Sequence, residues 1–181
     1  DAPVEDPKLS RWLETLRVSF DIPPLEIHSN NDFPTSAGLA SSASGFAALI
    51  TAINAFCELG LDQARCSQWA RRGSASAARS IYGGFVALVP PQWWAVPMAK
   101  KDHWPLEVVV AVTSTEAKDV SSGEGMERSR LTSAFYNAWL RDAAADFTAA
   151  SDAISSKDFA ALSAVAELSC LKMHSVMLTS Q

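Results

Sequence analysis

Residues 31–50 read NDFPTSAGLASSASGFAALI, and this stretch decides the fold because a loop turns into a helix within it. Pro34 opposes regular structure, and Gly38 permits a tight backbone path. Apolar residues then recur at spacings of three and four: Phe46, Ile50, Ile53 and Cys57. This periodicity predicts a helix to about Leu59, with Gly60 well placed to end it.

The start of this predicted helix is built from small residues: Ser36, Ala37, Ala40, Ser41, Ser42 and Ala43. A helix start leaves N–H groups unpaired and carries a partial positive charge, so it stabilises an anion. The serine hydroxyls add further donors, and the stretch therefore predicts a phosphate-binding loop. The alternative is a close-packed core helix whose serines act as caps. The spacing fits neither a Walker loop nor a dinucleotide-binding glycine motif.

The composition fits a soluble globular protein. The 181 residues suffice for one well-buried domain or parts of two, with 48% hydrophobic and 19% charged residues. The net charge of −5 argues against a nucleic-acid partner. No apolar run approaches the roughly 20 residues of a membrane span, so we expect no membrane contact. The three scattered cysteines fit reduced thiols of a cytoplasmic protein, and no metal-ligand cluster is visible.

The order of predicted elements indicates an α+β fold. The expected elements are a helix around residues 9–16, a strand at 25–29, the long helix, a helix from Asp62 to about Arg72, a strand at 85–89, a loop or hairpin at 90–105, a buried strand at 106–112, helix from about 123 to 155, and a last helix capped by Asp158. The first part thus mixes strands and helices, and the second is nearly all helix. We expect a domain at residues 1–105 and another at 106–181.

A second run of small residues surrounds Arg79. An arginine flanked by glycine, serine and alanine has room to point into a cleft, and its planar guanidinium suits a carboxylate or phosphate. Ser74 and Ser76 could complete an oxyanion-binding cluster. The alternative is an ordinary surface arginine.

Three motifs carry a resemblance to a known family. PTSAGLASSAS at residues 34–44 resembles the phosphate loop of the GHMP small-molecule kinases and, within them, of the mevalonate diphosphate decarboxylase family. ARRGSASAARSIYGGFV at 70–86 is similar to that family's Gly-Ser-Gly-Ser-Ala-x-Arg-Ser-x-x-Gly-Gly signature, with Ala75 in place of a glycine. KDVSSGEGM at 118–126 resembles its Lys-x-Val-Ser-Ser-x-x-Gly-Met segment.

The resemblance implies a GHMP-kinase-type two-domain fold, with an α/β domain around the phosphate loop and a second domain rich in helices. It implies that ATP, with Mg²⁺ neutralising its phosphates, is bound by Ala37, Gly38, Leu39, Ala40, Ser41, Ser42 and Ser44. It implies that the substrate, mevalonate diphosphate, is bound by Ser74, Ser76, Arg79 and Ser122. Arg79 would also act in catalysis by orienting the substrate carboxylate. Taken alone, Ser121 and Ser122 could equally be helix caps.

The implied activity is ATP-dependent decarboxylation of mevalonate 5-diphosphate to isopentenyl diphosphate by a cytoplasmic homodimer. The alternatives are a related kinase that does not decarboxylate and a catalytically dead nucleotide-binding or interaction module. The family's Asp-Ala-Gly-Pro-Asn segment, which holds its catalytic aspartate, does not occur in the 181 residues. Its N-terminal Lys-Tyr-type segment is also missing. We therefore expect the chain to be an internal fragment, with the fold incomplete at both ends.

Overall fold

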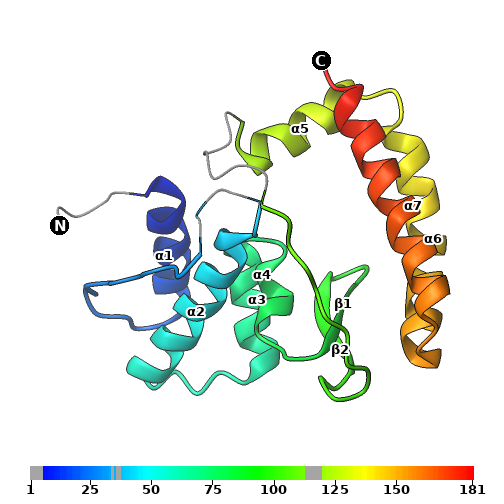
Figure 1. Ribbon diagram of the computed structural model, residues 1–181. Coiled ribbons are helices and arrows are strands. Elements are labelled where there is room, and N and C mark those ends of the chain that lie inside the picture. Colours follow the sequence, from blue (N-terminus) through cyan, green and yellow to red (C-terminus); the bar gives the residue numbers. More distant parts are fainter. Residues whose placement is uncertain (1–5, 34, 36–37, 113–119) are drawn as a thin grey trace. The chain divides into compact units, whose positions relative to one another are not determined.

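The computed structural model describes residues 6–33, 35, 38–112 and 120–181, which fall into two compact units, Asp1–Ala117 and Lys118–Gln181 (Figure 1). The elements of the first unit are α1 (Pro7–Ser19), α2 (Ser41–Phe56), α3 (Gln63–Gly73), α4 (Ala77–Ser80), β1 (Phe85–Val89) and β2 (Trp94–Ala99). Those of the second are α5 (Ser122–Thr132), α6 (Tyr136–Ser156) and α7 (Phe159–Leu178). The described chain is therefore mostly helical with one small sheet.

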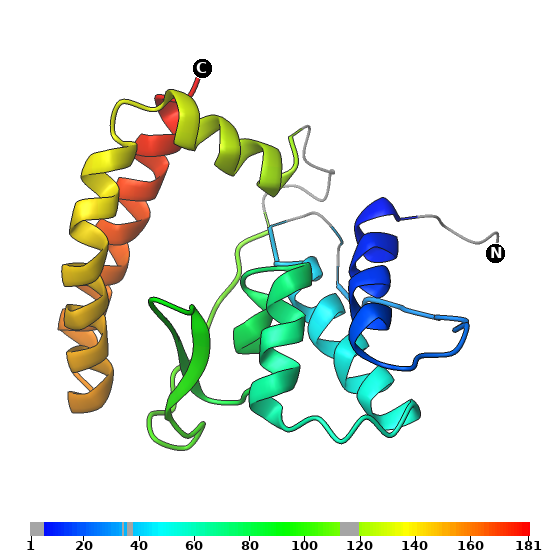
Figure 2. The same ribbon diagram turned by 180° about the vertical axis from the view of Figure 1, so that it is seen from behind.

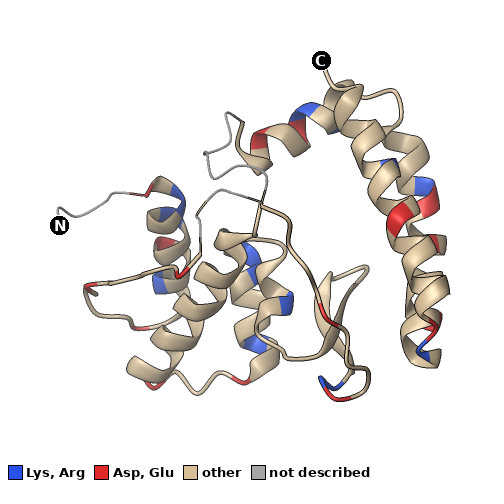
Figure 3. Cartoon of the chain, viewed as in Figure 1, with Lys and Arg blue, Asp and Glu red and all other residues tan. Residues whose placement is uncertain are grey.

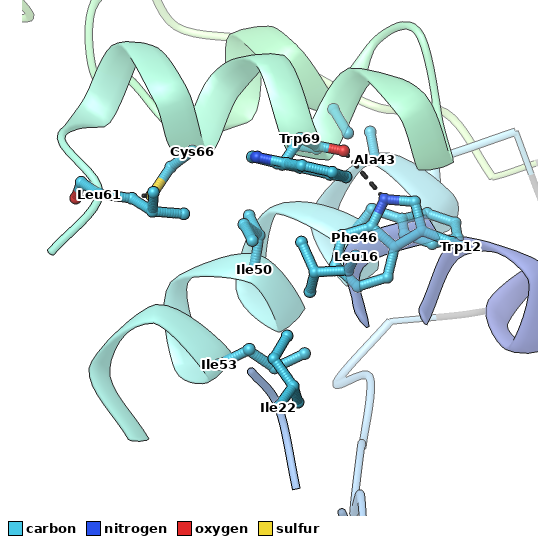
Figure 4. Packing of buried hydrophobic residues seen from close by; sticks show 12 residues of the cluster. Trp12, Leu16, Ile22, Ala43, Phe46, Ile50, Ile53, Leu61, Cys66 and Trp69 are labelled. Carbon is cyan, nitrogen blue, oxygen red and sulfur yellow. Dashed lines mark hydrogen bonds between the residues drawn. The ribbon is translucent and has the colours of Figure 1, made fainter. Parts of the chain in front are cut away.

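The core of the first unit lies between α1, α2 and α3 (Figure 4). The predicted apolar face of α2 is buried, with Ile50 fully enclosed, and Phe46 packs edge-on against Trp12 at a ring-centre distance of 5.5 Å. The Trp12 Nε1–H donates to the carbonyl of Trp69 at 2.9 Å, which ties α1 to α3. This arrangement places the start of α2 next to the end of α3.

The connection between α2 and α3 begins earlier than the sequence predicts. The helix ends at Phe56 rather than near Leu59, because Glu58 adopts a left-handed conformation with φ of 50°. The N–H of Leu59 then donates back to the carbonyl of Asn54 at 3.0 Å, the reversal typical of a Schellman motif. The Asn54 amide also exchanges two hydrogen bonds with the backbone of Leu61, at 3.0 and 2.9 Å. As predicted, Asp62 caps α3, accepting from the N–H of Arg65.

The predicted strand at residues 85–89 is confirmed as β1. It pairs antiparallel with β2, from Val89 opposite Trp94 to Val86 opposite Pro97, so the connection at 90–105 contains the second strand of a hairpin. The hairpin lies beside α3, as Figures 1 and 2 both show. Gly84 precedes it with φ of 80°, and a Cβ there would meet the backbone N of Lys101 at 2.7 Å.

Two other predicted strands are wrong. Residues 25–29 have no regular structure, because alternation alone does not supply a neighbouring strand to pair with. Residues 106–112 are also irregular, and Val108 and Val109 are 87% and 94% exposed. In the described part of the first unit, the hairpin is the only sheet, and it does not extend to this run.

The second unit corrects the prediction of one helix from about 123 to 155. The helix is broken between Thr132 and Tyr136, where the Ser133 hydroxyl accepts from the N–H of Phe135 at 3.3 Å. The expected last helix is confirmed as α7, with the Asp158 carboxylate accepting from Ala161 at 2.9 Å. The two long helices are joined by Lys172.

The Lys172 ammonium group contacts Asp142 at 3.0 Å and Asp146 at 2.9 Å. Hydrogen bonds to Asp146 and, to a smaller extent, to Asp142 raise the pKa of Lys172.

With 20 residues and a mean hydropathy of 1.2, α7 is long and apolar enough, by length and composition alone, to cross a bilayer. The helix also contains Glu167 and Lys172, and the expectation of no membrane contact stays a prediction.

Candidate functional site

The start of α2, where the sequence predicts phosphate binding, has no side-chain cap. Its N-cap is Ala40, in a left-handed conformation with φ of 54°, and no side chain caps the first turn. By contrast, side chains cap α1, α3, α5 and α7: Asp6, Asp62, Ser121 and Asp158. Figure 3 shows α2 without a charged residue, so no carboxylate in the helix repels a phosphate. The partial positive charge at this end of the helix dipole therefore favours an anion.

The predicted ATP-binding residues differ in their position at the helix start and in the hydrogen bonds of their side chains. Gly38, with φ of 89°, and Leu39 are exposed before the helix. Ser41 and Ser42 form the first two positions of α2. The Ser44 hydroxyl donates to the carbonyl of Ser41 at 3.0 Å, so it is used within the helix. Ala37, like the neighbouring Pro34 and Ser36, lies outside the described residues.

The two serine motifs of the first unit meet in space. Ser42 Oγ lies 3.3 Å from Ser74 Oγ, and Ser74 Oγ lies 3.4 Å from Ser76 Oγ. Ser74 follows the last residue of α3, and Ser76 precedes α4. A serine predicted to bind ATP is thus hydrogen-bonded to a serine predicted to bind substrate. We call the three hydroxyls of Ser42, Ser74 and Ser76 the serine row.

Arg79 is on α4, three positions along the chain from Ser76. Its backbone N–H donates to the carbonyl of Ser76 at 3.1 Å, and its side chain is exposed. Because α4 packs against both α2 and α3, the backbone of Arg79 lies near the serines at the ends of these helices. Arg79 can bind an anion by charge and the serines by hydroxyl donors.

The sequence analysis did not single out Ser67. Its hydroxyl is buried and donates to the carbonyl of Ala78, next to Arg79, at 2.8 Å. A polar side chain on the apolar face of α3, between Cys66 and Trp69, was the signal available in the sequence.

Ser122, the fourth residue predicted to bind substrate, belongs to the second unit. It is the first residue of α5 and is exposed. The cap is Ser121, whose hydroxyl accepts from the N–H of Glu124 at 3.2 Å, so the alternative of a capping serine holds for Ser121. Lys118 and Asp119 of the same motif lie outside the described residues.

Two titratable groups of the first unit, Cys66 and Tyr82, have raised pKa values. Burial, and then the negative charge of Asp62, raises the pKa of Cys66. Burial raises the pKa of Tyr82, with smaller contributions from Asp62 and Cys66. Both groups therefore stay protonated and neutral near pH 7. Among the described residues, His, Cys, Asp and Glu do not gather in threes as a metal site would need.

An uncapped helix start of small residues, neighbouring serine hydroxyls and an exposed arginine, in a chain of helices with one small sheet, fit an α+β protein of the GHMP-kinase type. Comparison with known families agrees. Residues 2–92 match the diphosphomevalonate decarboxylase-like N-terminal domain, and residues 108–181 match the mevalonate 5-diphosphate decarboxylase C-terminal domain. The chain belongs to the diphosphomevalonate decarboxylase family.

Curated relatives extend beyond the matched region. The diphosphomevalonate decarboxylase of Candida albicans is 39% identical over 185 residues, covering 93% of this chain and 51% of the relative. That of Ganoderma lucidum is 38% identical over 165 residues, covering 87% and 41%. The chain thus spans about half the length of the curated relatives it matches.

Solved structures show the same fold. The mevalonate diphosphate decarboxylase of Staphylococcus aureus has a TM-score of 0.83 and 36% identity, covering 98% of this chain and 56% of that one. A complex described as MDDEF with MVAPP, AMPPCP and magnesium has a TM-score of 0.79 and 34% identity, covering 99% and 57%.

Proposed function

We propose that the full-length protein catalyses the ATP-dependent decarboxylation of mevalonate 5-diphosphate to isopentenyl diphosphate. The observation that carries this proposal is the hydrogen bond between Ser42 and Ser74. It joins the motif expected to bind the nucleotide to the motif expected to bind the substrate. A phosphoryl transfer between the two ligands requires such proximity.

In this proposal the start of α2 binds the phosphates of ATP. The positive end of its helix dipole and the hydroxyls of Ser41 and Ser42 would stabilise the phosphate oxygens. When bound, ATP supplies the phosphoryl group that turns the substrate 3-hydroxyl into a leaving group, and Mg²⁺ neutralises charge. The structure described as a complex of MDDEF with AMPPCP and magnesium supports both requirements for the family.

The remaining residues would hold the substrate. Ser74, Ser76 and Ser122 would donate to its diphosphate, and Arg79 would pair with its carboxylate. As the 3-phosphate leaves with the electrons of its C–O bond, the bond to the carboxylate breaks and its electron pair forms the new double bond. Arg79 fixes the carboxylate so that this bond stays aligned with the departing group.

The test supplies the full-length protein with ATP and mevalonate diphosphate and measures carbon dioxide and inorganic phosphate together. Equal amounts of the two products are expected. Phosphate without carbon dioxide would contradict the proposal, and so would phosphorylated substrate that accumulates, as a related kinase would produce. Nucleotide binding without turnover would indicate a catalytically dead module.

The family resemblance also supports a cytoplasmic homodimer without membrane or nucleic-acid partners, with domains at residues 1–105 and 106–181. The matched family domains end at 92 and begin at 108, and the compact units divide after Ala117. Sedimentation of the full-length protein and cell fractionation would test the dimer and the location. A stable monomer or a membrane-bound pool would contradict this part of the proposal.

A further inference from the structure

Ser67 is buried on α3, yet its hydroxyl bonds outside its own helix. Its residue is 2% exposed, and the Oγ donates to the carbonyl of Ala78 at 2.8 Å, eleven positions along the chain. Many other hydroxyls in these helices donate to the carbonyl four residues before them: Thr15, Thr51, Thr148, Ser151 and Ser155. That local bond is the usual arrangement for a helical serine or threonine. Ser67 instead joins two elements.

The short helix α4 depends on such a contact. It has four residues, and one turn of helix is not stable by itself because its few bonds do not offset the ordering of its backbone. Ala77 and Ala78 are fully buried, so this side of the turn faces the core. The Ser67 bond holds the carbonyl directly before Arg79. It therefore sets the rotation of the turn from which the guanidinium extends.

We propose that Ser67 is a positioning residue for Arg79. Its hydroxyl determines where α4 directs the guanidinium and thus where the substrate carboxylate is held. This inference rests on the proposed function for its catalytic consequence, but the packing of α4 can be measured without substrate. A displacement of about 1 Å in a positioned group can cost about a hundredfold in rate.

The kinetic test uses Ser67→Ala and Ser67→Cys in the full-length protein. Cysteine nearly preserves the volume but is a weak donor, so it separates the hydrogen bond from packing. We expect kcat for carbon dioxide release to fall at least about tenfold in both variants, with ATP affinity unchanged. The matched control is Trp12→Phe, which also removes a buried donor to a backbone carbonyl, that of Trp69 at 2.9 Å. It should lower stability and keep kcat; an equal fall in kcat in the control would overturn the inference.

A double-mutant cycle tests whether Ser67 acts through Arg79. Calorimetry would measure the affinity for mevalonate diphosphate in four proteins: wild type, Ser67→Ala, Arg79→Ala and the double variant. Ser67→Ala should weaken binding when Arg79 is present and have no effect when it is absent. The same loss in both backgrounds would overturn the inference.

Hydrogen–deuterium exchange separates this inference from the proposed function. In Ser67→Ala the backbone amides of residues 77–82 should exchange faster than in the wild type and in Trp12→Phe. Unchanged exchange would overturn the inference whatever the activity. Faster exchange in a protein that never releases carbon dioxide would refute the proposed function and leave the role of Ser67 in holding α4.

Discussion

Ser42 Oγ and Ser74 Oγ share a hydrogen bond of 3.3 Å across 32 positions of sequence. Ser42 is the second residue of α2 and Ser74 follows α3, and the two helices pack on a common core. The contact brings the motif at residues 34–44 and the motif at residues 70–86 together on one polar surface. We expect the two serines to depend on each other in binding.

Ser74→Ala should raise KM for mevalonate diphosphate about tenfold, and Ser42→Ala should raise KM for ATP about as much, because each loses a hydrogen bond to a charged ligand. The double variant should lose less than the product of the two effects, since the hydroxyls orient each other. Steady-state kinetics of the full-length protein measure this. As a control, Thr51→Ala in α2 removes a hydroxyl that bonds only within the helix, to Ala47 at 2.8 Å, and should leave both values unchanged. Fully multiplicative losses would show that the serines act independently.

Arg79→Ala should lower carbon dioxide release about a hundredfold or more while ATP binding is retained, because it removes the charge that fixes the carboxylate. Product assays and nucleotide titration of the full-length protein measure the two effects. The control is Arg72→Ala, whose guanidinium stacks over the Trp69 ring at 4.0 Å. It should cost stability of about 0.5–1 kcal/mol and leave decarboxylation intact. Equal loss of ATP binding and carbon dioxide release in Arg79→Ala would remove the proposed role.

Gly73→Ala should destabilise the protein, because a Cβ at this last residue of α3 would overlap the buried ring of Phe46. Overpacking of this kind costs about 1–3 kcal/mol of the free energy of unfolding. In Gly45→Ala, the added Cβ meets nothing within 4 Å, and alanine is the better helix former. Chemical denaturation should therefore find Gly45→Ala as stable as the wild type or more so. A Gly73→Ala protein of unchanged stability would show that the core can rearrange around Phe46.

Stability should decrease above about pH 8.5, where an exposed thiol of the unfolded chain ionises. Burial and Asp62 raise the pKa of Cys66, so the unfolded state loses this proton first and is favoured as pH rises towards the folded pKa. Tyr82, whose pKa is also raised, contributes only above about pH 10. Urea midpoints between pH 7.5 and 9.5 should fall in the wild type and fall less in Cys66→Ala. Parallel slopes would assign the pH dependence to other groups.

Lys172→Met should destabilise the second unit, because it leaves Asp146, whose side chain is only 16% exposed, without its cation. Arg130→Met removes the exposed pair with Glu127 and should have little effect, since solvent screens such a pair. The raised pKa of Lys172 means that its contribution is complete below about pH 10.4, the pKa of an unperturbed lysine, and is lost as pH rises through the higher folded pKa. Thermal melts at pH 7 and pH 11.5 would show this, and equal effects of the two substitutions would contradict it.

The sequence predicts a structural feature correctly where a single side chain determines it, as at the start of a helix. Asp62 and Asp158 mark the starts of α3 and α7 because a carboxylate can accept the first free N–H groups of a helix. The apolar run at residues 85–89 also predicts β1, whereas residues 90–105 allow either a loop or a hairpin, and the structure shows the hairpin. Residues 106–112 show the opposite case: an apolar run predicts burial but does not specify which strand or layer covers it, and here the valines are exposed.

The amino-acid sequence by itself determined the helix start of small residues, the serine motifs and the family, because these depend on residue types at fixed short spacings. Only the tertiary structure decided that Ser42 lies beside Ser74 and that Ser67 bonds to the carbonyl before Arg79. Those distances follow from how α2, α3 and α4 pack around Phe46 and Trp69. Contacts between distant residues depend on the packing of whole helices, which no local spacing encodes.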